Sequence, residues 1–109
     1  MKSMVKYKHE ARAKIIKAMA HPSRLFIIEE LSKHERCVSE LTEMIGTDAS
    51  TVSKHLSVLK NAGLVADEKR GNSIFYNLRC PCIMDFMGCL EGVLSANAKE
   101  HANILKCCK

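Results

Sequence analysis

Hydrophobic residues recur at helical spacing over the first third of the chain and divide it into two elements. In residues 7–20, the apolar positions lie three or four apart and form one stripe, with most of the basic residues outside it. Pro22 follows, and because proline is favoured at the start of a helix, it predicts a second helix through residues 23–33. The two stripes contain Ala11, Ile15, Ile16 and Met19 in the first helix and Leu25, Ile28 and Leu31 in the second.

Two shorter helices are predicted next, separated by a turn. The first spans residues 37–46 and is stopped by Gly46. The second spans residues 49–63, with Asp48 suited to its N-cap and Gly63 to its C-terminal stop. Two short helices joined by a glycine-containing turn are typical of a helix-turn-helix. Their buried positions are predicted at Leu41, Met44 and Ile45 and at Val52, Leu56 and Leu59.

The hydrophobic period changes to two in residues 64–78, which predicts a β-hairpin. Polar residues 67–73 form its turn around Gly71 and Asn72. The order of elements therefore predicts a mainly α (α+β) fold in a single domain spanning residues 1–109: a winged helix-turn-helix with additional helices at both ends and one β-hairpin wing.

Helical spacing returns in the last element, from Pro81 to about Leu105. Its apolar residues form a nearly heptad seam, which is too long and too one-sided for the last helix of so small a monomer. The seam therefore predicts that this helix takes part in dimerisation. It consists of Ile83, Phe86, Met87, Leu90, Val93, Leu94, Ile104 and Leu105.

Composition narrows the classes of function. The 109 residues are 47% hydrophobic, which argues against disorder and suits one domain. Lys and Arg number 17 against 12 Asp and Glu, so the formal charge of +5 favours a polyanionic partner. No N-terminal apolar run is long enough for a signal peptide or membrane span, so a cytoplasmic location without membrane contact is expected. No phosphate-binding loop or catalytic Ser/His/Asp order occurs, so we expect no enzyme activity.

The second helix of the helix-turn-helix carries polar residues outside its buried stripe. Short hydroxyls near the helix start, followed by Lys and His, suit major-groove base edges and nearby phosphates, and a basic hairpin tip suits the backbone or minor groove. Any one of these residues alone is equally typical of a solvated surface, but the combination favours double-stranded DNA as the partner. The candidate DNA-binding residues are Ser50, Thr51, Ser53, Lys54, His55, Ser57 and Lys60 in the helix and Lys69, Arg70 and Asn72 at the hairpin tip.

Three stretches, HPSRL, STVSKHLSVLKNAGLV and the hairpin that ends in YNL, carry a family resemblance. Over residues 21–78 the chain resembles the ArsR/SmtB family of metal- and stress-responsive repressors. The resemblance implies a homodimer built from the first and last helices, bound to an operator that overlaps its own promoter and released by an inducer. A two-fold dimer would read two half-sites.

Six cysteines in a reducing compartment are more typical of metal-binding or redox groups than of a disulfide framework. One inducer site of the family uses a Cys-x-Cys pair at the start of the helix-turn-helix. Here Cys37 occupies the first position but Ser39 the second, and residues 1–36 contain no cysteine to complete the site. A second family site uses Asp and His on the last helix. Asp85, Glu100 and His101 are present there at a different spacing.

The remaining cysteines, Cys80, Cys82 and Cys89, form the main candidate metal site. Three thiolates without a nearby His favour trivalent arsenic or antimony, or alternatively cadmium or lead, over zinc. On a continuous helix, Cys82 and Cys89 would be about 10 Å apart along the axis. Since sulfur ligands of one ion must lie within roughly 4 Å of each other, the segment around Pro81 must be non-helical and fold back, or another cysteine must join. Secondary candidates are Cys37, Cys107 and Cys108.

These observations predict a DNA-binding transcriptional repressor that requires no cofactor for DNA binding and is released by a thiophilic inducer, most readily arsenite or antimonite. The alternative is a thiol redox or polysulfide sensor without metal, in which two of the same cysteines form a bridge. A cysteine on a helical stripe, such as Cys89, can also be a small core residue with no sensing role.

Overall fold

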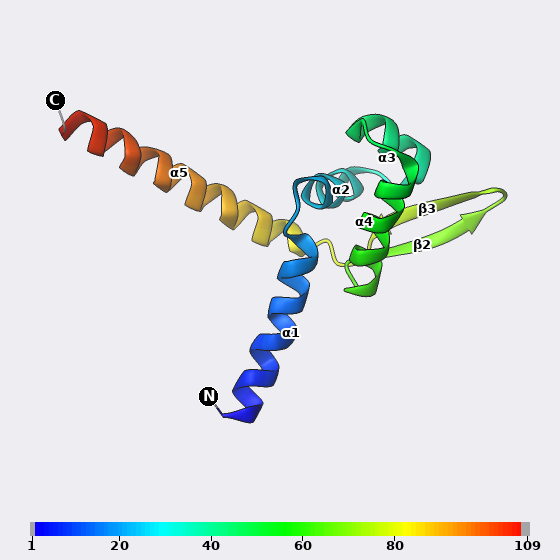
Figure 1. The fold of residues 1–109 in the computed structure, drawn as a ribbon, viewed down its shortest axis with the longest axis horizontal. Helices are drawn as coiled ribbons and strands as arrows, with labels where there is room; N and C mark the ends of the chain where they lie inside the picture. Colours follow the sequence, from blue (N-terminus) through cyan, green and yellow to red (C-terminus); the bar gives the residue numbers. More distant parts are fainter. Residues whose placement is uncertain (1, 108–109) are drawn as a thin grey trace.

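The computed structural model describes the backbone of residues 2–107 and the side chains through residue 102. The elements follow in the order α1 (Ser3–Met19), α2 (Pro22–Lys33), β1 (Arg36–Cys37), α3 (Val38–Ile45), α4 (Ala49–Asn61), β2 (Val65–Arg70), β3 (Ser73–Leu78) and α5 (Ile83–Cys107). Helices α2, α3 and α4 pack together beside the hairpin, whereas α1 and α5 extend away from this body in different directions (Figure 1). The predicted winged helix-turn-helix is confirmed.

Side chains and glycines set the helix ends where the sequence predicts them. His21 caps α2, because its Nδ1 accepts the Ser23 N–H at 3.0 Å. Asp48 caps α4 by accepting the Thr51 N–H at 3.3 Å. Gly46 ends α3 with a φ of +80°, a left-handed conformation that glycine adopts without strain.

A second left-handed glycine turns the chain from α4 into the hairpin. Gly63 has a φ of +81°, and its N–H donates to the Lys60 carbonyl at 3.0 Å. The next N–H, from Leu64, reaches back to the Leu59 carbonyl at 3.0 Å, which completes a Schellman motif. The motif delivers Leu64 and Val65 directly into the core.

The hairpin joins β2 to β3 in antiparallel register, with Arg70 opposite Ser73 and a two-residue loop between them. The sequence did not predict β1. This two-residue strand pairs with the other edge of β3, with Cys37 opposite Phe75, so that the sheet has the order β1-β3-β2. The start of α3 is thereby attached to the wing.

The core lies between α2, α3, α4 and the base of the hairpin. The predicted stripes of α3 and α4 are confirmed for Leu41 and for all three positions of α4, whereas Met44, near the end of α3, is exposed. Glu30 is the buried charged residue among the described side chains. The core consists of Ala18, Met19, Ile27, Ile28, Leu31, Leu41, Val52, Leu56, Leu59, Leu64 and Val65.

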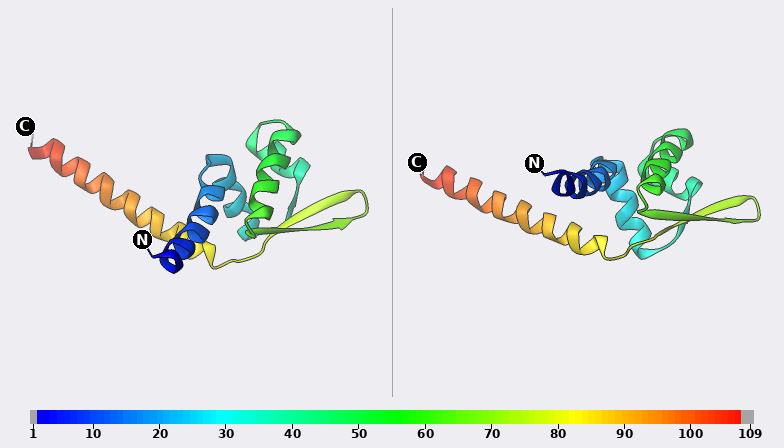
Figure 2. Two further views of the ribbon diagram at one scale, coloured as in Figure 1. Left: turned by 60° about the horizontal axis from the view of Figure 1, so that its bottom comes forward. Right: turned by 90° about the horizontal axis from the view of Figure 1, so that it is seen from below.

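The two terminal helices leave most of their apolar stripes outside this core. In α1, Ile15 and Ile16 are 39% and 50% exposed, and in α5, Val93 and Leu94 are 57% and 61% exposed. Helix α5 projects away from the body, whereas the C-terminal end of α1 packs against it through Ala18 and Met19 (Figure 2). The side chains of Ile104 and Leu105 lie outside the described residues. Over the part of the chain that the structure covers, none of the helices has the length and apolar character needed to cross a membrane.

Candidate nucleic-acid interface and thiol positions

The outer face of α4 is mostly polar. Three apolar side chains of this helix are fully buried, which fixes the helix rotation and turns Ser53, Lys54 and Ser57 toward solvent. Ser50 is also exposed and donates to Asp48 Oδ2 at 2.9 Å. Hydrogen bonds from Thr51, and then from Ser50, lower the pKa of Asp48, so the capping carboxylate is charged at neutral pH.

His55 does not lie on this outer face. Its ring packs against His21 at the start of α2, with the ring centroids 4.4 Å apart. Burial lowers the pKa of His55, and the neighbouring His21 and Arg24 lower it further. The side chain therefore joins α4 to α2, and Thr51, which is half-buried one turn earlier, lies on the same edge of the helix.

Two of the predicted DNA-binding cations are held in ion pairs in the free protein. Lys60 Nζ lies 2.9 Å from Asp67 Oδ2 at the base of the wing, and this bond raises the pKa of Lys60. Arg70 donates to Glu35 and, at 2.9 Å, to Glu68, and these carboxylates raise its pKa. Its guanidinium carbon also lies 5.2 Å from the centroid of the Phe75 ring. Both cations are therefore partly neutralised where they stand.

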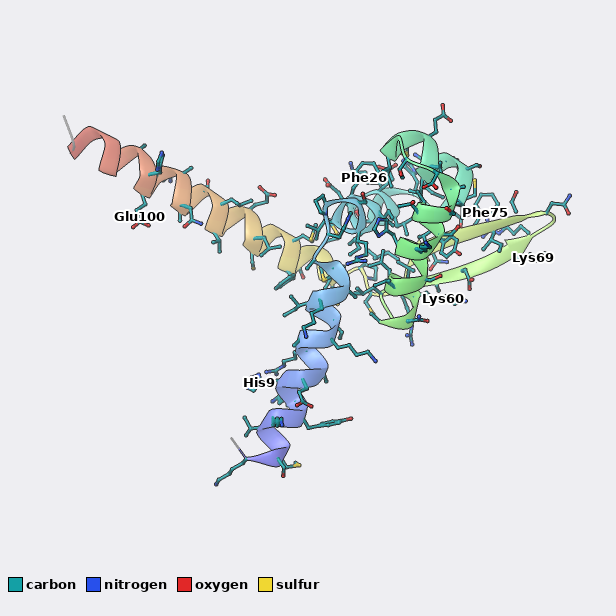
Figure 3. All side chains as sticks on the ribbon, viewed as in Figure 1. His9, Phe26, Lys60, Lys69, Phe75 and Glu100 are labelled. Carbon is teal, nitrogen blue, oxygen red and sulfur yellow. The ribbon has the colours of Figure 1, made fainter. Side chains whose placement is uncertain are left out.

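The wing also carries polar residues that are exposed to solvent. Lys69 and Asn72 are exposed, Lys69 farther along the wing than Lys60 at its base (Figure 3). Two further exposed residues of the outer face of α4, Val58 and Asn61, were missed at the sequence level. The signal was present, because they continue the spacing of three and four residues from Lys54.

The thiols ahead of α5 occupy a tight turn. Cys80 and Cys82 precede the helix, and the Ile83 and Asp85 N–H groups donate back to their carbonyls, each at 3.1 Å. Cys89 lies within α5, and all three cysteines are exposed. The required non-helical segment around Pro81 is thus present. Among the side chains described, however, no three His, Cys, Asp or Glu residues group closely enough to hold a metal ion. Cys107 and Cys108 lie outside the described side chains.

Cys37 is half-buried at the N-cap of α3, where polar contacts surround it. Its N–H donates to Glu40 Oε1 at 3.1 Å, and its Sγ lies 3.3 Å from the same oxygen and 3.1 Å from Ser39 Oγ. Arg36 donates to Glu40 and to the buried Glu30, each at 3.0 Å. The bonds from Cys37, and then from Arg36, lower the pKa of Glu40. This network ties α2, β1 and α3 together and gives Cys37 a structural place.

Comparisons with known proteins agree with this architecture. A sequence model described as "Bacterial regulatory protein, arsR family" matches residues 21–67, from the cap of α2 into β2. The uncharacterized HTH-type transcriptional regulator Rv0081 of Mycobacterium tuberculosis is 33% identical over 99 residues, which span 90% of this chain and 87% of the relative. The chain belongs to the ArsR family.

Further comparisons cover most of the chain. The crystal structure of Rv0081 superposes with a TM-score of 0.76 at 31% identity, covering 94% of this chain and 99% of that one. NolR from Sinorhizobium fredii gives a TM-score of 0.79 at 30% identity, covering 85% and 93%. The biofilm growth-associated repressor of Xylella fastidiosa is 31% identical over 88 residues, covering 81% and 77%. The ArsR-family assignment thus extends to the terminal helices.

Proposed function

We propose that this ArsR-family protein is a transcriptional repressor in which α4 enters the major groove of operator DNA and the wing grips the adjacent backbone. The outer face of α4 carries the proposal, because a core-anchored helix presents the hydroxyls of Ser53 and Ser57 together with Lys54 to solvent. The Xylella relative named as a repressor supports the direction of regulation. The whole chain, residues 1–109, acts as one DNA-binding domain and has no catalytic role.

The proposed active form is a homodimer. Helices α1 and α5 expose Ile15, Ile16, Leu90 and Val93, and a hollow of about 250 Å³ between the two helices is lined almost entirely by apolar atoms. Exposed apolar surface of this extent favours burial against a partner, at about 25 cal/mol for each Å² removed from water. A second copy would cover both helices and set two α4 helices on successive major grooves, about 34 Å apart.

Binding to the DNA upstream of the protein's own gene tests this proposal. Light scattering should give a dimer, and fluorescence anisotropy should show one dimer per site, bound more tightly than to an unrelated duplex of equal length. Equal affinity for both duplexes would contradict the repressor assignment. A monomer at the concentrations used for binding would contradict the dimer.

For the inducer, we propose a thiophilic ion, arsenite or antimonite first and cadmium or lead as alternatives, held by Cys80, Cys82 and Cys89. The chemistry of three thiols fits such ions. Since the described side chains of one chain form no such group, capture needs the turn before α5 to rearrange or a further cysteine from Cys37, Cys107, Cys108 or the partner chain. By linkage, inducer and DNA then weaken each other's binding by the same factor.

Single Cys→Ser variants distinguish this site from its alternatives. Arsenite, antimonite, cadmium or lead added to reduced protein should release operator DNA and produce thiolate–metal absorption. Serine at position 80, 82 or 89 should abolish release, whereas C37S and serine at 107 and 108 test whether one of those cysteines completes the site. Release by oxidant or polysulfide alone, with no response to the ions, would favour the redox alternative instead.

A further inference from the structure

Helix α1 brings two lysines beside the outer face of α4. Lys14 and Lys17 line an open hollow of about 310 Å³ together with Val58 and Asn61 of α4. All four of these side chains are exposed. The hollow is therefore a shallow surface shared by two helices.

This surface continues the proposed DNA-reading face. On α4, Lys54, Val58 and Asn61 are spaced four and three residues apart, so they form a row along one side of the helix. The row ends at the lysines of α1. The view from below shows α1 and α4 on the same side of the molecule, with the base of α5 toward the other (Figure 2).

The charge of α1 fits a polyanion. Residues 2–17 contain six Lys and Arg and one acidic residue, Glu10, which pairs with Lys6 at 3.8 Å. Within the described part of the chain, no carboxylate lies at ion-pairing distance from Lys14 or Lys17, in contrast to Lys60 and Arg70, which are paired. The positive charges of these two lysines are therefore not offset by a paired carboxylate, in contrast to those of Lys60 and Arg70.

We propose that Lys14 and Lys17 bind phosphates of the DNA backbone next to the groove entered by α4. The inference rests on the proposed function, and it gives α1 a part in DNA binding. Lysine contacts to phosphate add affinity for any sequence and release counterions. They position the protein on the duplex, whereas the hydroxyls of α4 face the bases.

The test is the salt dependence of binding by a K14Q/K17Q double variant. The slope of the logarithm of the DNA-binding constant against log salt is negative, and it should become shallower by about 0.9 for each lost phosphate contact. Two contacts per protomer give a change of about 2 per protomer and about 4 per dimer. Affinity should fall by the same factor for the operator and for an unrelated duplex. K33Q/K99Q removes the same charge from α2 and α5 and should leave the slope close to that of the wild type.

An unchanged slope in the α1 variant, or an equal decrease in the α2 and α5 variant, would overturn the inference while leaving the repressor assignment intact. Loss of the dimer in K14Q/K17Q, seen by light scattering, would also overturn it, because the hollow would then be covered by a second copy. If the wild-type protein binds no duplex at all, the proposed function fails first and this inference with it.

Discussion

The ring of His55 rests on the ring of His21, 4.4 Å away between centroids, and the same His21 caps α2 through Nδ1. The contact joins the helix proposed to read DNA to the start of the helix that supports it. The same contact leaves the ring of His55 half-buried between the two helices.

Stability should therefore fall in acid. The pKa of His55 is lowered in the folded state, so the folded protein binds fewer protons than the unfolded chain between the two pKa values. The free energy of unfolding should be highest above the ordinary histidine value of about 6.5 and decrease as the pH falls below it. Urea denaturation across this range measures the effect, and H55Q should flatten the pH dependence. An H55Q profile as steep as that of the wild type would contradict this assignment.

Removal of the His21 side chain tests the cap itself. H21A should lower the free energy of unfolding by about 0.5–2 kcal/mol at neutral pH, the usual cost of losing an N-cap. H34A, an exposed histidine just after α2, is the matched control and should change stability little. Equal effects of both variants would show that the cap contributes nothing.

Glu35 forms an ion pair with Arg70 in the free protein, and Arg70 is a proposed DNA-binding residue. E35Q should increase DNA affinity, because Arg70 would no longer have to break its ion pair with Glu35 before it binds a phosphate. For one exposed charge, the increase should be less than about tenfold. E29Q, on the exposed side of α2, removes the same charge at a distance from the wing. Anisotropy titrations at fixed salt separate the two, and a fall in affinity for E35Q would contradict this role of Glu35.

Lys54 and Lys69 should differ in what they contribute. K54A should cost tenfold to a hundredfold in operator affinity and reduce the preference over unrelated DNA, because we propose that the exposed face of α4 that carries Lys54 enters the major groove. K69A, at the wing, should weaken binding to both duplexes alike and reduce the salt slope by about 1 per protomer. Competition titrations with the two duplexes measure both quantities. The reverse pattern would place α4 on the backbone and the wing on the bases.

Substitution by alanine at Gly63 and at Gly92 should change the stability of the protein in opposite directions. Gly63 has a φ of +81°, and a Cβ there would lie 3.2 Å from Arg79 Nη1, so G63A should destabilise the protein by about 1 kcal/mol. Gly92 lies within α5 with nothing within 4 Å of an added Cβ, so G92A should stabilise the helix by up to about 1 kcal/mol. Thermal unfolding of the two variants decides it, and stabilisation by G63A would contradict the Schellman geometry.

The sequence was sufficient for the elements because its local signals are strong. Asp48, Gly46 and Gly63 mark helix ends through backbone geometry, and the period of the apolar residues distinguishes helix from hairpin. Strand β1 escaped prediction because two residues carry no period, and its pairing with β3 depends on chain segments nearly 40 residues apart.

The candidate site was less predictable, since charge partners come from other elements. Nothing near Arg70 in sequence indicates that Glu35 lies beside it, and the position of His55 follows from the docking of α2. Likewise, the period of α1 identifies its apolar stripe but not what covers it, and Ile15 and Ile16 are exposed in the single chain. The hydrophobic period identifies an apolar face, but tertiary or quaternary packing determines which surface covers it.

Only four residues, Arg79 to Cys82, separate the central strand β3 from α5. With 25 residues, α5 is about 37 Å long, so a small swing at this short connection sweeps its far end through several ångströms. Conversely, a displacement of the far end of α5 is transmitted through this connection to β3, and from β3 to β1 and β2, which pair with its two edges. A ligand bound at this junction would therefore weaken operator binding without contacting any of the residues that contact the duplex.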